Sequence, residues 1–159
     1  MTIGVISDTH NFLDPRIPGL FQGAGVEHIL HAGDIGQPSL LAQLRQVAPV
    51  TCVAGNTDDP ALGFKLFETA ELDGRRFLLH HIVNPRSPSD SVRAAILRER
   101  AAAVVFGHSH KPYCGTSSGV LFFNPGYAGK PRFALPRSIA VIRSDAEGLH
   151  PELITLDGR

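Results

Sequence analysis

Short apolar runs, each followed by a polar turn, organise the first third of the chain. Three of them, Ile3–Ile6, His28–His31 and Val50–Ala54, have the composition of buried strands. Helix-like segments separate these runs, and Ser39 could cap the second one, which carries Leu40, Leu41, Leu44 and Val47 on one face. Strands that alternate with helices predict right-handed βαβ units, parallel pairing, and ligands gathered where the strands end at their carboxyl edge.

The middle of the chain changes to a hairpin pattern. Asp73-Gly74 supplies a turn, residues Phe77–Leu79 form the returning strand, and the outgoing strand has the alternating apolar residues Phe64, Leu66, Ala70 and Leu72. Ser89 or Asp90 could then cap a helix that turns Val92, Ala95 and Ile96 inward. A further strand is expected at Val104–Phe106.

Two more strand pairs are expected after residue 110. The stretches "YCGTSSGVLFFNPG" and "SIAVIRSDAEGLHPELITL" each suggest two strands around a turn that contains glycine. No linker, low-complexity stretch or repeat interrupts the chain, so residues 1–159 are expected to form a single domain. The predicted fold class is α/β, with two mixed β-sheets packed face to face and helices outside them.

Composition narrows the classes of function. Hydrophobic residues make up 43% and charged residues 19%, which fits a soluble globular protein. The formal net charge is zero and no Lys/Arg block occurs, so charge gives no reason to expect nucleic acid or an anionic membrane as a partner. Cys52 and Cys114 form no CxxC pair, and the first residues have neither a basic leader nor a long apolar run. We expect a cytoplasmic protein, and its oligomeric state is open.

Potential metal ligands follow the predicted strands. Carboxylate, imidazole and amide groups at these positions suit divalent transition metals such as Mn, Fe or Zn, and the absence of cysteine argues against a structural thiolate zinc site. In an extended chain, Asp8 and His10 would point to the same side, as would His108 and His110. The full set comprises Asp8, His10, Asp34, Asn56, His80, His81, His108 and His110.

Each motif also has an ordinary structural interpretation. The stretch "VAGNTDDP" has the composition of a turn, and D-x-H is a common capped turn. We interpret His31 as a partly buried and His28 as a surface histidine on a strand, and neither as a ligand. The sequence "FGHSH" is harder to explain by solvation alone, and the glycines before Asp34, Asn56 and His108 would let the backbone turn sharply.

Taken in order, the motifs resemble those of the calcineurin-like metallophosphoesterases. They are D-x-H at Asp8, G-D at Asp34, G-N-x-D at Asn56, a histidine at the end of a strand, and G-H-x-H at His108. "FFNPGY" and the later Pro131-Arg132 resemble the small phosphodiesterase subgroup of that superfamily. The resemblance implies a four-layer αββα sandwich and covers nearly the whole chain.

The resemblance also implies a set of roles. One metal ion would be bound by Asp8, His10 and His110 and the other by Asn56, His80 and His108, with Asp34 bridging both. The two divalent ions, Mn²⁺ first and Fe, Zn or Ni as alternatives, would share a bridging hydroxide that attacks a small phosphoester. Asn56 and His108 would lie near the phosphoryl oxygens, and Asn56 with Asp58 behind it would serve catalysis.

Three positions depart from the family pattern. Gln37 stands where an acidic residue is often found, and His81 follows His80 where many members have glycine. Adjacent strand residues point to opposite faces, so only one of the two histidines should bind metal, and motif order favours His80. Thr57 replaces a histidine that resembles a general acid, which points toward phosphodiesters with activated aryl leaving groups.

Two other functions remain open at this stage. A protein-binding scaffold on the same fold, similar to the metallophosphoesterase-like retromer subunit, should have lost ligands, whereas here all seven implied positions are filled. An amidohydrolase or metallo-lactamase-like hydrolase would place an H-x-H motif near the first strand, where this chain has D-x-H. A metal-dependent phosphodiesterase is therefore the leading prediction.

Overall fold

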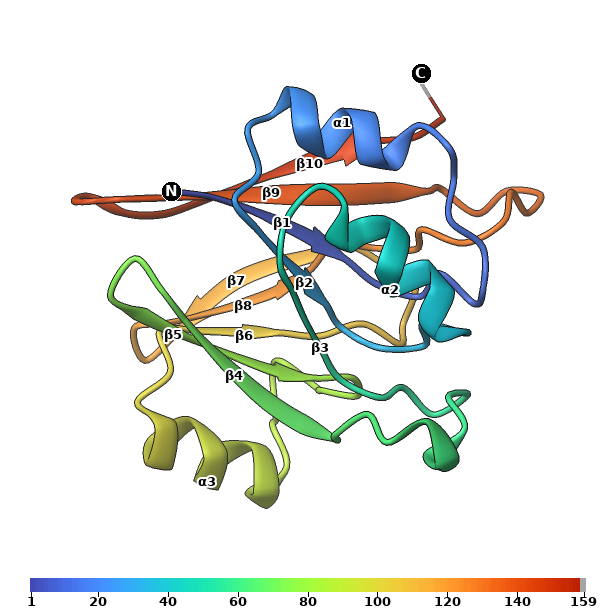
Figure 1. Ribbon diagram of the computed structural model, residues 1–159. Helices are drawn as coiled ribbons and strands as arrows, with labels where there is room; N and C mark the ends of the chain where they lie inside the picture. Colours follow the sequence, from blue (N-terminus) through green and yellow to red (C-terminus); the bar gives the residue numbers. More distant parts are fainter. Residues whose placement is uncertain (158–159) are drawn as a thin grey trace.

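The computed structural model describes residues 1–157, which form two five-stranded β-sheets packed face to face (Figure 1). The first sheet has the strand order β10-β9-β1-β2-β3, and the second has the order β4-β5-β6-β8-β7. The strands of the first sheet are β1 (Thr2–Ile6), β2 (His28–His31), β3 (Val50–Cys52), β9 (Ser138–Asp145) and β10 (Gly148–Thr155). Those of the second are β4 (Phe67–Leu72), β5 (Arg75–His80), β6 (Ala103–Val105), β7 (Tyr113–Ser117) and β8 (Val120–Asn124).

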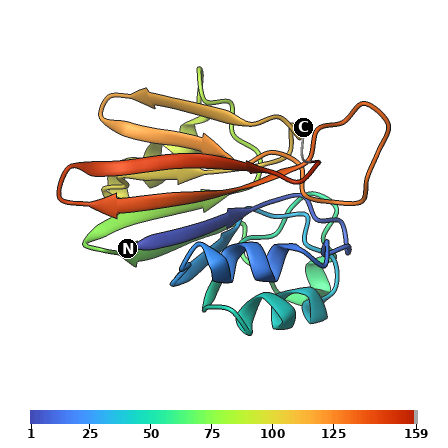
Figure 2. The same ribbon diagram turned by 90° about the horizontal axis from the view of Figure 1, so that it is seen from above.

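Helices cover the outer face of each sheet, as Figure 2 shows from a second direction. The parallel strands β1, β2 and β3 are joined through α1 (Ile17–Gly23) and α2 (Pro38–Arg45), and the parallel strands β5 and β6 through α3 (Asp90–Glu99). A short 3₁₀ turn, η1 (Pro60–Leu62), lies between β3 and β4. The described chain thus forms the four-layer α/β sandwich that the sequence predicts.

Alternating strand residues divide the core into three apolar layers. In β5, Phe77 and Leu79 face the space between the sheets, where they join Ile3 and Val5 of β1. Leu78, between them, packs outward against the layer under α3. A third layer lies between the first sheet and helices α1 and α2. Every strand near the centre is covered on both sides, which is why these strands read as continuous apolar runs.

The predicted turns and caps are largely confirmed. Asp73 and Gly74 both have positive φ, 54° and 74°, which suits a two-residue hairpin turn between β4 and β5. Ser89 caps α3, because its hydroxyl accepts a hydrogen bond from the Val92 amide. The prediction for α2 is wrong in detail: Gln37, in an extended conformation, occupies the cap position and Pro38 begins the helix, so Ser39 lies inside it.

The outgoing strand of the central hairpin is shorter than its apolar pattern suggests. Strand β4 begins at Phe67, so Phe64 and Leu66 lie in the preceding segment. Phe64 packs against the layer under α1 and α2, and Leu66 is exposed. The backbone there is tied to the end of β3 by a hydrogen bond from the Ala54 amide to the Lys65 carbonyl.

The helices of residues 1–157 are short. The longest, α3, has ten residues, and none has the length and apolar character needed to cross a membrane.

Candidate metal centre

Loops at the carboxyl ends of parallel strands from both sheets bring six potential ligands together. They form two groups, in each of which the ligand atoms lie within 4.8 Å of one another. The first ligand group comprises Asp8, His10 and His110, and the second comprises Asp34, His81 and His108. The first sheet supplies Asp8, His10 and Asp34, and the second supplies the other three histidines. The candidate centre therefore needs ligands from both sheets and forms only when the sheets pack together.

The two groups adjoin each other through their carboxylates. In the first, Asp8 Oδ1 lies 3.4 Å from His110 Nε2, and it is also 3.8 Å from His81 Nε2 of the second group. Asp34 Oδ2 lies 3.1 Å from His81 Nε2 and 3.7 Å from His10 Nε2 of the first group. Each carboxylate therefore faces ligands of both groups, as expected of a centre for two neighbouring cations.

Two buried atoms of this centre lack hydrogen-bond partners within the described chain. They are Asp8 Oδ1 and His81 Nε2, and the approach of His81 Nε2 to Asp34 Oδ2 does not have hydrogen-bond geometry. A buried polar atom without a partner carries a desolvation cost that native structures normally avoid. A divalent cation between a carboxylate oxygen and an imidazole nitrogen would satisfy both atoms, so the residues fit a metal site.

The other oxygen of each carboxylate is held by the protein. Asp8 Oδ2 accepts hydrogen bonds from the Ser7 hydroxyl at 2.7 Å and from the His108 amide at 3.1 Å. Asp34 Oδ1 accepts one from the Thr57 amide at 2.9 Å. These contacts orient each carboxylate and leave one oxygen of each directed at the histidines.

The structure places His81, and not His80, in this centre. His81 is buried, and its Nδ1 donates to the Ala32 carbonyl at 2.7 Å, which leaves Nε2 free to accept a metal ion. His80 points to the other face of β5, where its ring stacks on Phe67 at 3.8 Å and its Nδ1 donates to the Leu66 carbonyl. The preference for His80 is therefore corrected.

Asn56 lies next to the second ligand group. Its Oδ1 accepts a hydrogen bond from His108 Nδ1 at 3.0 Å, and both residues are exposed. Their exposure permits contact with a substrate, and the placement of Asn56 and His108 near the phosphoryl oxygens stays a prediction. Thr57, the neighbour of Asn56, is also exposed, and its backbone amide donates to Asp34 Oδ1.

Asp58 has a structural position behind the centre. Its buried carboxylate accepts backbone hydrogen bonds from Ile35 at 2.9 Å, Gly36 at 3.0 Å and Gly55 at 2.8 Å. It thereby joins the loop after β2 to the loop after β3 and belongs to neither ligand group. Asp58 is a positioning residue by this geometry. Gln37, the other departure nearby, is exposed, and its backbone amide donates to Asn11 Oδ1.

The ligand loops have an unusual backbone. Five of the six ligands have positive φ, between 47° and 71°, a conformation that residues other than glycine rarely adopt: Asp8, His10, Asp34, His108 and His110. The expectation that the D-x-H and H-x-H pairs are extended is therefore wrong. Their side chains converge because the chain turns at each ligand, and such strained conformations cluster at functional sites.

Two of the glycines that precede site residues, Gly55 and Gly107, allow neighbouring loops to pack closely and do not serve sharp turns. A Cβ added to Gly55 would overlap the carboxylate and backbone of Asp34. One added to Gly107 would overlap the Ser7 hydroxyl and lie 2.6 Å from Asp8 Oδ2. Neither glycine has positive φ, so each one's role is to let a neighbouring loop approach a ligand carboxylate.

Several supporting residues were missed in the sequence. His31 is fully buried: its Nδ1 accepts from the Gly33 amide, and its Nε2 donates to the Thr9 hydroxyl, which in turn donates to the Ile35 carbonyl. Burial lowers the pKa of His31 to about 3. This neutral histidine supports the loop that carries Asp34, and its place after an apolar run gives no sequence signal beyond that of a strand residue. His28 is half-buried and contacts the Thr51 hydroxyl.

A second support lies under the G-H-x-H loop. Asn124 is buried at the end of β8, and its amide donates to the Gly107 carbonyl and to the Ser109 hydroxyl. The Tyr127 ring lies 4.8 Å from the His110 ring and 6.3 Å from the His10 ring. Both residues come from "FFNPGY". The resemblance of that stretch to the small phosphodiesterase subgroup was the sequence signal that could have pointed to them.

Electrostatics in the centre favour an ionised Asp34. Burial opposes its ionisation, but His81 and the Thr57 amide outweigh that effect and hold the pKa of Asp34 below its usual range. Burial also favours neutral His81, yet Asp34 and the Ala32 carbonyl raise the pKa of His81. Burial lowers the pKa of His110.

A family model described as the calcineurin-like phosphoesterase superfamily domain matches residues 1–147. The chain belongs to this superfamily. A protein named probable metallophosphoesterase from Methanothermobacter thermautotrophicus is 36% identical, over 97% of this chain and 92% of its own length. A protein named phosphodiesterase from Methanocaldococcus jannaschii is 24% identical, over 79% of this chain and 83% of its own length.

Solved structures share the fold of this superfamily member. The wild-type Vps29 of Entamoeba histolytica, solved in complex with zinc, has a TM-score of 0.73 and 18% sequence identity, and the match covers 98% of this chain and 99% of that one. At this identity the likeness shows the fold alone. Family membership and the two ligand groups together support a metal-dependent phosphoesterase hydrolase.

Proposed function

We propose that this chain hydrolyses phosphodiesters with two divalent metal ions bound in the two ligand groups. The observation that carries the proposal is the pair of adjoining groups whose buried Asp8 Oδ1 and His81 Nε2 have no other partner in the described chain. Asp8, His10 and His110 would hold one ion and His81, His108 and Asn56 the other. Asp34, which faces both groups, would bridge them.

Bound divalent ions would supply Lewis-acid polarisation of the phosphoryl oxygens and would acidify a water molecule to act as the nucleophile. The residues keep the centre cationic when it is loaded, because Asp8 and Asp34 are its only carboxylates within the described chain. A phosphate anion would therefore be attracted to it. Asn56 and His108, which are exposed, would contact the phosphoryl oxygens.

The absence of a titrating side chain at residue 57 bears on the substrate class. The threonine hydroxyl does not protonate a leaving group near neutral pH, and the loss of a positioned acid costs about a hundredfold or more with poor leaving groups. Acidic leaving groups need no such proton. We therefore infer a preference for small phosphodiesters with activated leaving groups, in line with the name of the Methanocaldococcus jannaschii relative.

Imidazole and carboxylate ligands are compatible with several metals. We propose Mn²⁺ as the working ion, with Fe, Zn or Ni as alternatives, because the mixed donor set has intermediate hardness. The zinc in the Vps29 structure shows that a protein of this fold can bind that metal. A cytoplasmic location and a homo-oligomer stay predictions.

The test is hydrolysis of bis(p-nitrophenyl) phosphate by chelator-treated protein with and without added Mn²⁺. We expect activity only with the metal, little activity on alkyl phosphomonoesters, and loss of activity in Asp34→Ala and His108→Ala. Arg98→Ala, on the exposed side of α3, is the control and should keep full activity. A protein loaded with metal but inactive on every phosphodiester tried would contradict the proposal.

A scaffold function is the second candidate, because Vps29 structures share this fold. The complete ligand set and the unsatisfied Asp8 and His81 atoms favour catalysis. A stoichiometric partner that binds equally well to metal-free and metal-loaded protein, together with absent hydrolysis, would favour the scaffold.

A further inference from the structure

The segment between Tyr127 and Arg137 forms a loop with a closed base next to the metal centre. Tyr127 pairs with Arg137 in an isolated parallel bridge, and the Ser138 amide donates to the Tyr127 carbonyl at 2.8 Å. The loop projects in both views from the edge of the molecule where β9 begins (Figures 1 and 2). Compact surface loops with adjacent ends are often functional.

Hydrogen bonds and an ion pair hold the base of this loop. Tyr127 is buried, and its hydroxyl donates to the Lys130 carbonyl at 2.9 Å. The buried Arg137 donates from Nε to the Gly129 carbonyl and pairs with Asp14 at 2.8 Å. At the tip, the Leu135 amide donates to the Arg132 carbonyl, so residues 132–135 form a turn. The loop therefore holds its tip in a defined place.

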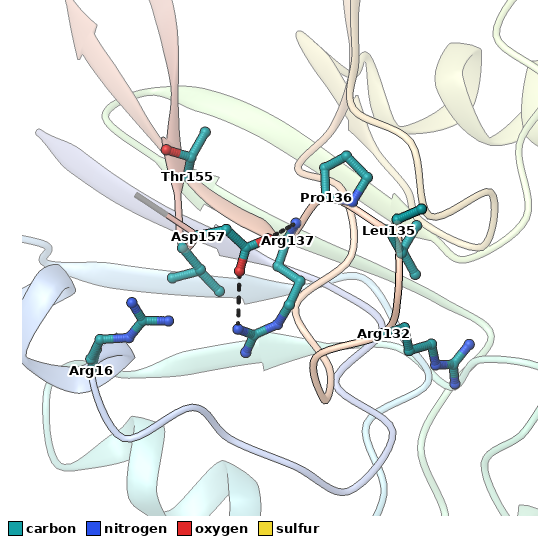
Figure 3. A pocket seen from close by; sticks show the side chains of 9 residues that line it. Arg16, Arg132, Leu135, Pro136, Arg137, Thr155 and Asp157 are labelled. Atoms are coloured by element: carbon teal, nitrogen blue, oxygen red, sulfur yellow. Dashed lines mark hydrogen bonds and ion pairs between the residues drawn. The ribbon is translucent and has the colours of Figure 1, made fainter. Parts of the chain in front are cut away.

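Arg132, on this turn, carries a charge that no acidic residue among residues 1–157 neutralises. Three arginines line a surface cavity of about 630 Å³ beside the loop. Arg16 and Arg137 pair with Asp14, and Arg137 also pairs with Asp157, whereas no ion pair within residues 1–157 includes Arg132. Figure 3 shows Arg137 linked to Asp157 and the Arg132 side chain directed away from both.

The position of Arg132 relates its charge to the metal centre. Its guanidinium carbon lies 5.1 Å from the centre of the Tyr127 ring, and that ring in turn lies 4.8 Å from the ring of His110. One buried aromatic ring therefore separates this exposed guanidinium, which has no ion pair within the described part of the chain, from a ligand of the first group. Arginine is well suited to an anion there, because its planar donors match phosphate or carboxylate oxygens in pairs.

We infer that Arg132 is a substrate-binding residue that recognises a second anionic group, beside the phosphorus under attack. The inference rests on the proposed phosphodiesterase function and narrows its substrate to esters that carry a further phosphate or carboxylate. Asp14 and Asp157 form ion pairs with the other two arginines of the cavity, Arg16 and Arg137. Arg132 is therefore the one cavity arginine within residues 1–157 whose charge is available to bind an anion. The selectivity should accordingly depend on this one side chain.

The test compares two substrates that differ only in a second phosphate. They are the p-nitrophenyl ester of thymidine 5′-phosphate and the same ester with an additional 3′-phosphate. The Mn²⁺-loaded wild type should show a higher kcat/KM for the doubly phosphorylated ester, and Arg132→Met should reduce that preference about tenfold or more. Arg132→Lys should keep part of it. Arg98→Met, which removes one exposed charge from α3, should leave it unchanged.

A merely structural role for Arg132 gives a different result. If Arg132 only covers Tyr127, Arg132→Met should lower the melting temperature or slow both esters in proportion, so the ratio of their kcat/KM values would stay as in the wild type. An unchanged ratio, or a wild type without preference, would overturn the inference.

A binding measurement keeps the inference testable if the protein hydrolyses neither ester. Calorimetry on the Mn²⁺-loaded protein compares thymidine 3′,5′-bisphosphate with thymidine 5′-phosphate. Tighter binding of the bisphosphate by wild type, lost in Arg132→Met, would support Arg132 while the proposed hydrolysis fails. Equal affinities in both proteins would overturn the role of Arg132 whatever the result for hydrolysis.

Discussion

In each of the two carboxylates of the centre, one oxygen is hydrogen-bonded to the protein and the other faces the potential metal site. Asp8 Oδ2 and Asp34 Oδ1 accept hydrogen bonds from the protein, and Asp8 Oδ1 and Asp34 Oδ2 face the histidines. Each side chain is thus oriented before any cation binds, which reduces the cost of ordering it. Such supporting contacts typically change metal affinity or activity by about 10- to 100-fold when they are removed.

At the scale of single residues, the adjacent histidines give the sharpest test of the site. We expect His81→Ala to lose bound metal at the second ligand group and to reduce kcat/KM by about a hundredfold or more, because it removes a ligand. His80→Ala is the matched control: its ring stacks on Phe67 away from the centre, so metal content should be unchanged. Metal analysis after gel filtration measures both. Metal loss in His80→Ala with retention in His81→Ala would contradict the site.

The sequence predicted the residue types of the centre but not which of these two histidines belongs to it. Motif order favoured His80, whereas the alternation of β5 decides the question: Phe77 and Leu79 face between the sheets, and His81 continues on that side. The same alternation puts His80 with Leu78 on the outer side. The packing of the second sheet against the first decides which side of β5 faces the centre, and the local sequence carries no information on that packing.

At the scale of elements, the ligand loops depend on one another. Backbone hydrogen bonds join the loop after β1 to the loop after β2, from Asp8 to Gly33 at 3.0 Å and from His10 to Asp34 at 2.9 Å. The positive φ angles of these ligands follow from this pairing between loops. The partners lie more than twenty residues apart, so the local D-x-H pattern could not predict the backbone conformation. The expectation of an extended chain at Asp8 and His10 was wrong for this reason.

Close packing of these loops predicts the effect of a single methyl group. Gly55→Ala would push a Cβ into Asp34, so we expect a loss of about 1–3 kcal/mol in the free energy of unfolding and weaker metal binding. Gly23→Ala, at the end of α1, meets nothing within 4 Å and should be neutral or stabilise by up to about 1 kcal/mol. Urea titration and metal titration measure the two effects. Equal behaviour of the two variants would contradict this packing.

The buried His31 predicts a loss of stability in acid. Its pKa falls from the usual 6.5 to about 3 in the folded protein, so between these values the unfolded chain binds the extra proton and stability rises with pH. Acidification from pH 6.5 to 5 should therefore cost about 2 kcal/mol at this residue.

The measurement is urea unfolding of chelator-treated wild type and His31→Gln across this pH range. Glutamine has no proton to take up, so the variant should lack this part of the pH dependence although it is less stable at neutral pH. Parallel curves for the two proteins would show that His31 does not remain neutral in the folded state.

At the scale of the whole molecule, the apolar pattern was sufficient to predict two packed sheets with outer helices. It gave no indication of the buried Arg137, which joins Asp14 near α1 to Asp157 after β10. A charged side chain in a sequence reads as exposed, and its burial here depends on partners more than one hundred residues away on one side and twenty on the other. The apolar pattern therefore predicted the layers, but it could not predict the long-range polar contacts.

The central claim is that two metal ions held by loops of both sheets support phosphodiester hydrolysis. It is tested most directly by titrating metal-free protein with Mn²⁺. Bound metal per chain and the rate of bis(p-nitrophenyl) phosphate hydrolysis are followed in the same samples. The two adjoining ligand groups predict that activity rises as binding approaches two ions per chain and disappears on chelation. Protein that binds two ions and remains inactive, or activity that survives complete metal removal, would contradict the account.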